Sequence, residues 1–307
     1  MINPPQNTSD ITVFAPAKVN LILRILDRRS DGFHNLWSVM QTVALDDEVR
    51  IRLRTDRPDI QLRCDATDLA ADQTNLVYRA AAAVLAQAQQ SIGLDIELRK
   101  RIPMGAGLGG GSSDAAATII GLNCLLQLKW SPAQMAGVGQ SLGSDVPFFL
   151  FAPAACVTGR GETVRPVVVE GTRWVVLVNP GFGVNTKWAY QELAATRTSV
   201  RSLSQAQQEL DRQSRVGWVP LIAAAENDFE APVFAAHSAL REIKQSLQDH
   251  GAELALLSGS GATVLGVFTS EARARHAQAQ FVTEKSMKVF IIPTCSGPLT
   301  WRYARSQ

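Results

Sequence analysis

The sequence is poor in the residue types that build metal sites. Its 307 residues include only four cysteines and four histidines. No two cysteines have C-x-x-C spacing, and the histidines are scattered, so the sequence suggests no zinc site. Isolated cysteines of this kind are typical of buried thiols in a reducing compartment. We therefore expect a protein of the cytoplasm.

The sequence also lacks long apolar runs and a strong charge of either sign. No stretch approaches the roughly 18 apolar residues that a membrane-spanning helix needs. The first ten residues lack the basic and apolar regions of a signal peptide. The formal net charge is +2, so neither nucleic acid nor a membrane surface is favoured as a partner. We expect a small molecule instead, and the sequence predicts no oligomeric state.

Glycine, by contrast, is concentrated in one short segment. Five glycines fall within the seven positions from Gly105 to Gly111, and residues of N-cap type follow from Ser112 to Asp114. Apolar residues then recur at three- and four-residue steps over 116–128, which predicts a helix. Free N–H groups and the positive end of the helix dipole meet at such a junction. The segment therefore predicts an anion site, most often one for phosphate.

Two common phosphate-binding patterns fit this segment only in part. The spacing G-x-G-x-x-G begins at Gly105, but the expected acidic residue about 20 positions later is absent, since no Asp or Glu lies between Asp114 and Asp145. This absence disfavours a nicotinamide oxidoreductase. The spacing of a P-loop is also present, but Gly111 stands where its lysine belongs. A phosphate loop without that lysine needs its positive charge from elsewhere in the chain.

The segment around these glycines resembles the phosphate loop of the GHMP small-molecule kinases. Three consecutive glycines, with Lys-Arg-Ile-Pro at 100–103, are similar to the branch of that family that acts on 4-diphosphocytidyl-2-C-methyl-D-erythritol. The resemblance implies ATP as the phosphoryl donor, and phosphoryl transfer implies Mg²⁺. The pattern does not assign a protein ligand for the metal, and Ser113 is only a candidate. The residues expected to bind ATP are Pro103, Met104, Gly105, Ala106, Gly107, Leu108, Gly109, Gly110, Gly111, Ser112 and Ser113.

Three further motifs resemble segments of the same family. Lys18 and Asn20, in Pro-Ala-Lys-Val-Asn, lie two apart and share one face of an expected strand. Asp145, in Gly-Ser-Asp-Val-Pro, is similar to the aspartate that faces the acceptor hydroxyl. The resemblance implies that Lys18 and Asp145 are catalytic and that Asn20 contacts substrate. From the residues alone, a solvated lysine on an edge strand and an aspartate in a helix-ending turn remain open. Residues 257–263 resemble a segment that packs under the phosphate loop, where we expect a supporting role.

A fifth motif concerns the substrate. Asp-Gly-Phe-His at 31–34 is similar to a segment of the diphosphocytidyl branch that normally reads Asp-Gly-Tyr-His. The resemblance implies that Phe33 and His34 contact the cytidine end. Phenylalanine retains the stacking surface but loses the hydroxyl of tyrosine. Tyr190 aligns with an aromatic residue that covers the base, and Trp188 is the alternative.

The remaining segments predict an α+β protein. Residues 11–14 and 19–26 are expected to form separate strands, because Pro16 cannot donate to a sheet ladder. Residues 49–54 alternate strictly between apolar side chains and arginine, which predicts a buried face and a solvated face. The second half follows the order strand–helix–helix–strand–strand–helix–strand, typical of helices packed on an antiparallel sheet. Residues 196–218 are polar and carry no motif.

The resemblance covers residues 12–293 and implies the two-domain GHMP kinase fold, with a ribosomal-S5-like N-terminal domain and a ferredoxin-like C-terminal domain. We place the N-terminal domain, with the phosphate loop, at 1–170 and the C-terminal domain at 171–307. The implied function is ATP-dependent phosphorylation of a hydroxyl of 4-diphosphocytidyl-2-C-methyl-D-erythritol in the non-mevalonate isoprenoid pathway. The alternatives are a homoserine- or mevalonate-type kinase, or a non-catalytic nucleotide- or sugar-binding regulator. The presence of both Lys18 and Asp145 argues against a regulator.

Overall fold

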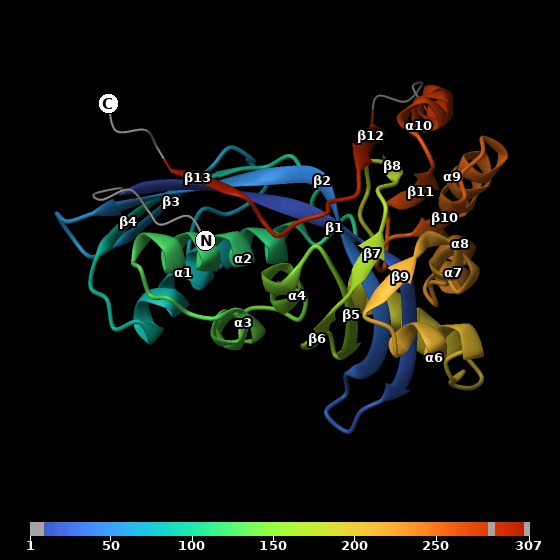
Figure 1. Ribbon diagram of the computed structural model, residues 1–307, viewed down its shortest axis with the longest axis horizontal. Helices are drawn as coiled ribbons and strands as arrows, with labels where there is room; N and C mark the ends of the chain where they lie inside the picture. Colours follow the sequence, from blue (N-terminus) through green and yellow to red (C-terminus); the bar gives the residue numbers. More distant parts are fainter. Residues whose placement is uncertain (1–8, 282–285, 304–307) are drawn as a thin grey trace.

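The computed structural model describes residues 9–281 and 286–303, which form two lobes side by side (Figure 1). The first lobe is organised around two long antiparallel strands, β1 (Asp10–Arg28) and β2 (His34–Arg54). Both strands extend beyond the first lobe, and their far ends lie alongside the second (Figure 1). The same two strands therefore contribute to both lobes.

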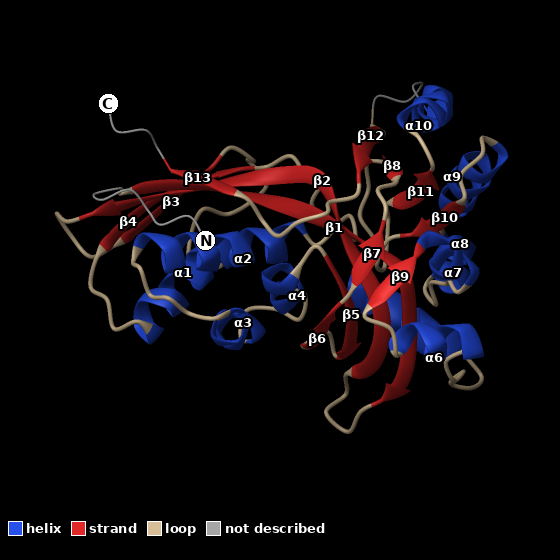
Figure 2. Ribbon diagram, in the orientation of Figure 1, coloured by secondary structure: helices blue, strands red, loops and turns tan. Residues whose placement is uncertain are grey.

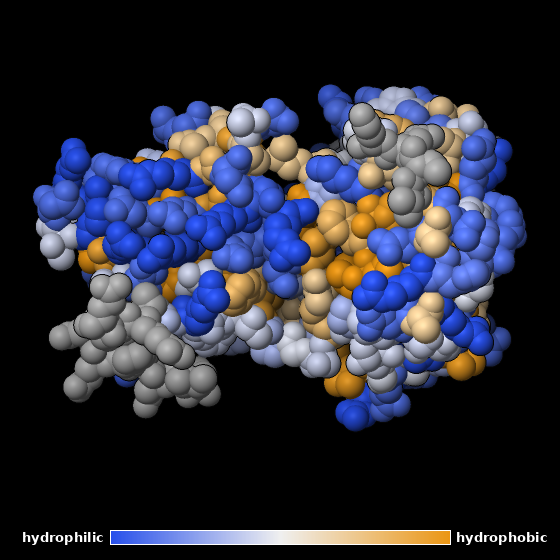
Figure 3. Space-filling view, turned by 90° about the horizontal axis from the view of Figure 1, so that it is seen from above, coloured by the Kyte–Doolittle hydropathy of each residue, from blue (hydrophilic) through white to orange (hydrophobic). Residues whose placement is uncertain are grey.

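The first sheet carries four helices on one of its faces. Its other elements are β3 (Ile60–Cys64), β4 (Gly93–Arg99), β5 (Ala154–Gly159), β6 (Thr163–Pro166), β13 (Trp301–Tyr303), α1 (Leu76–Gln87), α2 (Gly110–Leu125), α3 (Pro132–Gln140) and α4 (Val146–Phe151). In the described residues the strand order is β13–β1–β2–β4–β3, with β5 beside β2 and β6 beside β5. Helices α1 to α4 lie on one face (Figure 2). Much of the opposite face is hydrophilic (Figure 3). There the side chains of Arg50 and Arg52 are 40% and 51% exposed and pair with Asp10, whereas that of Arg54 is only 14% exposed. The solvated arginine face expected over 49–54 is therefore confirmed for Arg50 and Arg52 and wrong for Arg54.

Strand β1 is continuous where the sequence predicted a break. Pro16 lies inside it, and the pairing with β2 shifts register between Pro16 and Ala17. An irregularity of this kind accommodates a residue that has no N–H to donate. The prediction of separate strands at 11–14 and 19–26 was therefore wrong. The shift immediately precedes Lys18.

The second lobe is a sheet with helices packed against it. It contains β8 (Trp174–Asn179), β10 (Leu254–Leu257), β11 (Val264–Phe268), β12 (Lys288–Pro293), α5 (Thr186–Thr196), α8 (Glu230–Ala236), α9 (Ser238–Asp249), α10 (Glu271–Gln278) and the 3₁₀ turn η1 (Ala279–Phe281). The strands are antiparallel in the order β10–β11–β8–β12. On α9, Leu240, Ile243 and Leu247 recur at helical spacing and are buried. The expected arrangement of helices on an antiparallel sheet is confirmed.

The polar segment 196–218 joins the two lobes. It contains α6 (Gln205–Asp211) and β9 (Arg215–Gly217), which pairs in parallel with β7 (Val168–Glu170), and α7 (Trp218–Ala223) begins at its end. A capping box between Ser204 and Gln207 starts α6. Gln207 also accepts a 2.6 Å hydrogen bond from Arg24 of β1. A segment without a motif therefore has a structural role at the junction.

After the second lobe, the chain returns to the first lobe at β13. Strand β13 pairs with the start of β1, with Ile11 opposite Tyr303. The first sheet thus includes residues from both sides of the expected boundary at 170/171, which stays a prediction. No helix in the described ranges is both long and apolar enough to cross a membrane.

Candidate active site at the junction of the lobes

The glycine-rich segment forms a loop that leads into α2. Gly105, Gly107 and Gly109 adopt φ values of +63°, +76° and +70°, which side chains rarely permit. Gly109 is the N-cap residue, and α2 begins at Gly110 without a side-chain cap. The prediction that the cap lies within Ser112 to Asp114 was therefore wrong, because these residues lie inside the helix. The N–H groups at the start of α2 have no acceptor within the helix, as an anion site requires.

A pocket of about 390 Å³ lies along this loop. Lys100 contributes a cationic side chain to its wall, and Thr74 and Asn75 contribute polar groups. Every residue from Pro103 to Ser112 lines the pocket, as expected of residues that bind ATP. Ser113 does not line it, since its side chain is fully buried and its hydroxyl has no hydrogen-bond partner among the described residues. We call this cavity the donor pocket.

A second pocket, of about 250 Å³, brings together the residues expected to be catalytic. Lys18 Nζ donates a 2.6 Å hydrogen bond to Asn20 Oδ1 and lies 3.6 Å from Asp145 Oδ2. Asn20 in turn donates to Ser38 Oγ at 2.8 Å. Lys18 and Asn20 are buried, whereas the Asp145 side chain is 32% exposed toward the pocket. We call this cavity the acceptor pocket; Lys18, Asn20, Asp145 and Tyr190 all line it.

The two pockets meet at the phosphate loop. Gly107 and Gly109 line both of them. The backbone of Lys18 donates a 2.9 Å hydrogen bond to the carbonyl of Leu108, which fixes the loop to β1. A Cβ on Gly109 would lie only 3.0 Å from Lys18 Cγ and 3.1 Å from Phe149 Cζ. Glycine at this position therefore allows the lysine to approach the loop closely.

The segment 257–263 packs beneath the phosphate loop, as expected. Ser258 Oγ donates to the carbonyl of Gly107 at 3.0 Å. A Cβ on Gly259 would lie 3.2 Å from the same oxygen. Ser260 and Gly259 also line the acceptor pocket, so this turn lies close to the substrate as well as supporting the loop.

The aromatic residues expected at the cytidine end are only partly brought together. Tyr190 stacks on His34, with ring centroids 5.1 Å apart and planes at 21°. Burial and the Asp145 carboxylate raise the pKa of Tyr190 to about 12, so its hydroxyl stays protonated. Trp188 instead contacts His237, 5.7 Å away. Phe33 is 55% exposed and does not line the acceptor pocket, so its contact with the substrate stays a prediction.

His34 has a pKa below its ordinary value, first because of its burial and then because of the charges of Arg28 and Arg197. The imidazole is consequently neutral at pH 7, and a neutral ring stacks on Tyr190 without a desolvated charge. His34 does not itself line the acceptor pocket, but it contacts the pocket through Tyr190.

Comparison with known protein families agrees with this geometry. A model described as "GHMP kinases N terminal domain" matches residues 75–152, and one described as "GHMP kinases C terminal" matches residues 206–285. The chain belongs to the GHMP kinase family. The first match contains the phosphate loop and Asp145.

Two curated relatives of this GHMP kinase carry the same name. A protein of Citrifermentans bemidjiense, called 4-diphosphocytidyl-2-C-methyl-D-erythritol kinase, is 39% identical over 88% of this chain and 94% of its own. One of Heliobacterium modesticaldum with the same name is 40% identical over 87% and 89%. A solved structure of 4-(cytidine 5'-diphospho)-2C-methyl-D-erythritol kinase is 30% identical, with a TM-score of 0.74 over 93% of this chain and all of the other. Homoserine kinase from Cytophaga hutchinsonii, at 19% identity and a TM-score of 0.76, shares the fold.

Sequence reasoning missed a buried charged cluster behind the donor pocket of this GHMP kinase. Lys100 Nζ pairs with Asp47 and lies 2.6 Å from Asp114 Oδ2. Burial, together with the nearby Asp47 carboxylate, raises the pKa of Asp114 to about 8. Asp47 Oδ1 also accepts from the N–H of Ile102, at the start of the phosphate loop. Lys100 is the sequence signal for this cluster, but the sequence analysis interprets it only as part of the Lys-Arg-Ile-Pro segment.

Phe229 was also missed. It is almost fully buried, lines the acceptor pocket and meets Tyr190 edge-on, with centroids 4.8 Å apart. An apolar residue outside every motif carries no sequence signal for a site, so only the fold identifies it.

Proposed function

We propose that this kinase transfers the terminal phosphoryl group of ATP to a hydroxyl of 4-diphosphocytidyl-2-C-methyl-D-erythritol, in the non-mevalonate isoprenoid pathway. The names of the relatives at 39% and 40% identity support this substrate. The observation that carries the chemistry is the position of Lys18. Its ammonium lies between Asn20 and Asp145, in the pocket that shares Gly107 and Gly109 with the donor pocket.

The catalytic roles follow from what phosphoryl transfer demands. The transition state is loose, so positioning and charge stabilisation matter more than a strong base. Asp145 orients the acceptor hydroxyl. It takes the hydroxyl proton as the new P–O bond forms and the bond between the transferred phosphorus and the leaving ADP breaks. Lys18 stabilises the negative charge that develops on the attacking oxygen. Asn20 holds the lysine ammonium in place through the 2.6 Å hydrogen bond.

The residues of the donor pocket suit a nucleotide phosphate chain. Gly105, Gly107 and Gly109 have positive φ, and no side chain separates their backbone from a ligand. Magnesium would neutralise phosphate charge in this reaction. No group of three or more His, Cys, Asp or Glu side chains in the described residues could hold a metal ion. Phosphate oxygens would therefore supply most ligands. Of the two serines beside the loop, Ser112 lines the donor pocket, whereas the candidate Ser113 is fully buried.

The cytidine end of the substrate is assigned to the side of the acceptor pocket formed by Tyr190. His34 stacks on Tyr190, so a base that stacks on the same face requires the His34 ring to turn away. Phe33, 55% exposed, is available to cover the outer side of such a base. The partner is thus a cytidine diphosphate sugar-alcohol, and we expect the enzyme to act in the cytoplasm.

The direct test compares acceptors. Purified protein with ATP and Mg²⁺ is incubated with the cytidyl compound, homoserine or mevalonate, and ADP release is measured for each. We expect kcat/KM to be highest for the cytidyl compound, and Asp145→Asn serves as the inactive control. Equal kcat/KM for homoserine or mevalonate contradicts the substrate assignment and leaves only the kinase family.

A further inference from the structure

The segment Glu226–Glu230 connects strand β1 to both pockets, although no sequence motif marks it. Leu23 N donates to the carbonyl of Glu226 at 2.7 Å, and Asp228 N donates to the carbonyl of Leu23 at 3.0 Å. The segment thus pairs with β1 through an isolated parallel bridge at Asn227. Leu23 lines the acceptor pocket, so the pairing is close to the substrate site.

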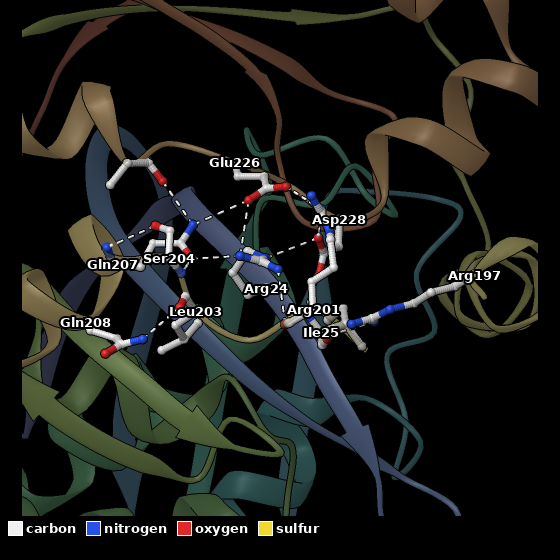
Figure 4. Close-up of polar contacts among 11 residues, drawn as sticks. Arg24, Ile25, Arg197, Arg201, Leu203, Ser204, Gln207, Gln208, Glu226 and Asp228 are labelled. Carbon is white, nitrogen blue, oxygen red and sulfur yellow. Dashed lines mark hydrogen bonds and ion pairs between the residues drawn. The ribbon is translucent and has the colours of Figure 1, made fainter. Parts of the chain in front are cut away.

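Charged side chains on both sides of Asn227 stabilise the segment. Arg24 is buried and lies between the two acids (Figure 4), with Nη1 3.1 Å from Glu226 Oε2 and Nε 3.2 Å from Asp228 Oδ1. Asp228 Oδ2 also accepts from the N–H of Ile25 at 2.7 Å. These side-chain contacts stabilise the segment. The two backbone hydrogen bonds to Leu23, which do not depend on the Asp228 side chain, set the position of Asn227 against β1, the strand that carries Lys18.

All the hydrogen-bonding groups of the Asn227 side chain are used. Nδ2 donates to the carbonyl of Leu257 at 2.7 Å and to that of Gly259 at 2.8 Å. Oδ1 accepts from the N–H of Phe229 at 2.9 Å. A side-chain amide has two N–H donors and one acceptor oxygen, and here each is matched to a backbone group. Asn227 is 4% exposed, so the loss of any one bond leaves a buried group unpaired.

Two of these three partners, Gly259 and Phe229, line the acceptor pocket. Gly259 lies beneath Gly107 of the phosphate loop, and Phe229 lies behind Tyr190 in the acceptor pocket. We propose that Asn227 is a positioning residue for phosphoryl transfer, whose amide sets the placement of the phosphate loop relative to the acceptor wall. This inference rests on the proposed kinase function.

The phosphate loop is consequently attached to β1 by two routes. One is direct, from Lys18 N to the carbonyl of Leu108 at 2.9 Å. The other passes through Asn227 and the turn at 257–259 to Gly107. Two attachments at neighbouring residues fix the tilt of the loop as well as its distance from the lysine. Misplacement by about 1 Å can cost on the order of 10² in rate.

The test uses two variants of the amide. Asn227→Asp keeps an acceptor for the N–H of Phe229 but loses both donors to the turn. We expect kcat to fall at least about tenfold with a smaller change in acceptor KM, because the phosphate loop is the part released. Asn227→Ala loses the acceptor as well, so its KM for the cytidyl compound should also rise. Both are assayed well below their melting temperatures.

The matched control is the neighbouring residue. The Asp228 side chain contacts Arg24, Arg201 and Ile25 N, and reaches neither the turn nor Tyr190. Asp228→Asn should lower Tm and leave kcat and KM of the folded enzyme within about twofold of wild type. If the Asn227 variants behave in the same way, losing Tm but not kcat, the positioning role is wrong.

A binding measurement separates this inference from the proposed function. If wild-type protein fails to phosphorylate the cytidyl compound, the function proposal fails, and a non-hydrolysable ATP analogue then reports on the loop. Asn227→Asp should bind the analogue at least about threefold more weakly than wild type, and Asp228→Asn should not. Unchanged affinity and unchanged turnover in Asn227→Asp overturn the inference.

Discussion

Lys18 Nζ is closer to Asn20 than to Asp145, at 2.6 Å from the amide oxygen and 3.6 Å from the carboxylate. The ammonium therefore donates a hydrogen bond to a buried neutral oxygen and keeps a looser, longer-range pairing with the acid. A partly exposed Asp145 is left with lone pairs free to accept from a substrate hydroxyl. This asymmetry is what a base that acts late in phosphoryl transfer requires.

Asp145→Asn is expected to retain the fold and the ATP affinity, because Asp145 lines the acceptor pocket and not the donor pocket. Removal of a positioned base typically lowers rate by about 10²–10⁴. Lys18→Met should lower kcat to a similar extent. The fold loss of kcat in the double variant should be smaller than the product of the two single losses, because the effects of residues that act as a unit are not additive. Steady-state kinetics with calorimetric ATP titration provide the measurement, and near-normal kcat in either single variant rules the mechanism out.

The sequence allowed much of the site to be predicted because its residues lie in compact motifs. Lys18 and Asn20 are two apart on one strand, so their shared face follows from strand geometry. Their approach to Asp145, more than 120 positions away, came only from resemblance. The helix cap was mispredicted because glycine at 109 adopts a conformation that leaves Ser112 to Asp114 inside the helix. The role of Asn227 could not be predicted, because its side chain forms three hydrogen bonds with backbone groups that only the folded chain brings together.

Gly109→Ala is expected to impair turnover more than Gly105→Ala does. Both glycines have positive φ, so alanine at either position strains the backbone by roughly 1–2 kcal/mol. A Cβ at Gly105 meets no atom within 4 Å, whereas one at Gly109 lies 3.0 Å from Lys18 Cγ. The lysine must therefore shift only in Gly109→Ala. Kinetics and ATP titration on both variants, alongside thermal melts, provide the comparison; equal kcat in the two would show that the Lys18 contact is unimportant.

The pH dependence of stability should report on Asp114. Its pKa is raised to about 8 by burial, against an ordinary value of 3.8. The folded state therefore binds a proton that the unfolded state releases, and the free energy of unfolding should fall as pH rises from about 4 to 8. In Asp114→Asn this loss is absent, because the amide does not titrate. Melting curves across that range should show a steeper decline for wild type, and parallel curves would contradict the assignment.

Tyr190→Ala should raise KM for the cytidyl compound and leave KM for ATP unchanged, since Tyr190 lines only the acceptor pocket. Stacking of an aromatic side chain on a base contributes about 1–3 kcal/mol in nucleic-acid binders, which corresponds to roughly ten- to hundredfold in affinity. Tyr190→Phe should behave like wild type, because the ring and not the protonated hydroxyl supplies the contact. Trp188→Ala is the matched control, as Trp188 packs on His237 away from the pocket wall. KM values for both substrates decide the question: an effect in Trp188→Ala and none in Tyr190→Ala would assign the base to the tryptophan instead.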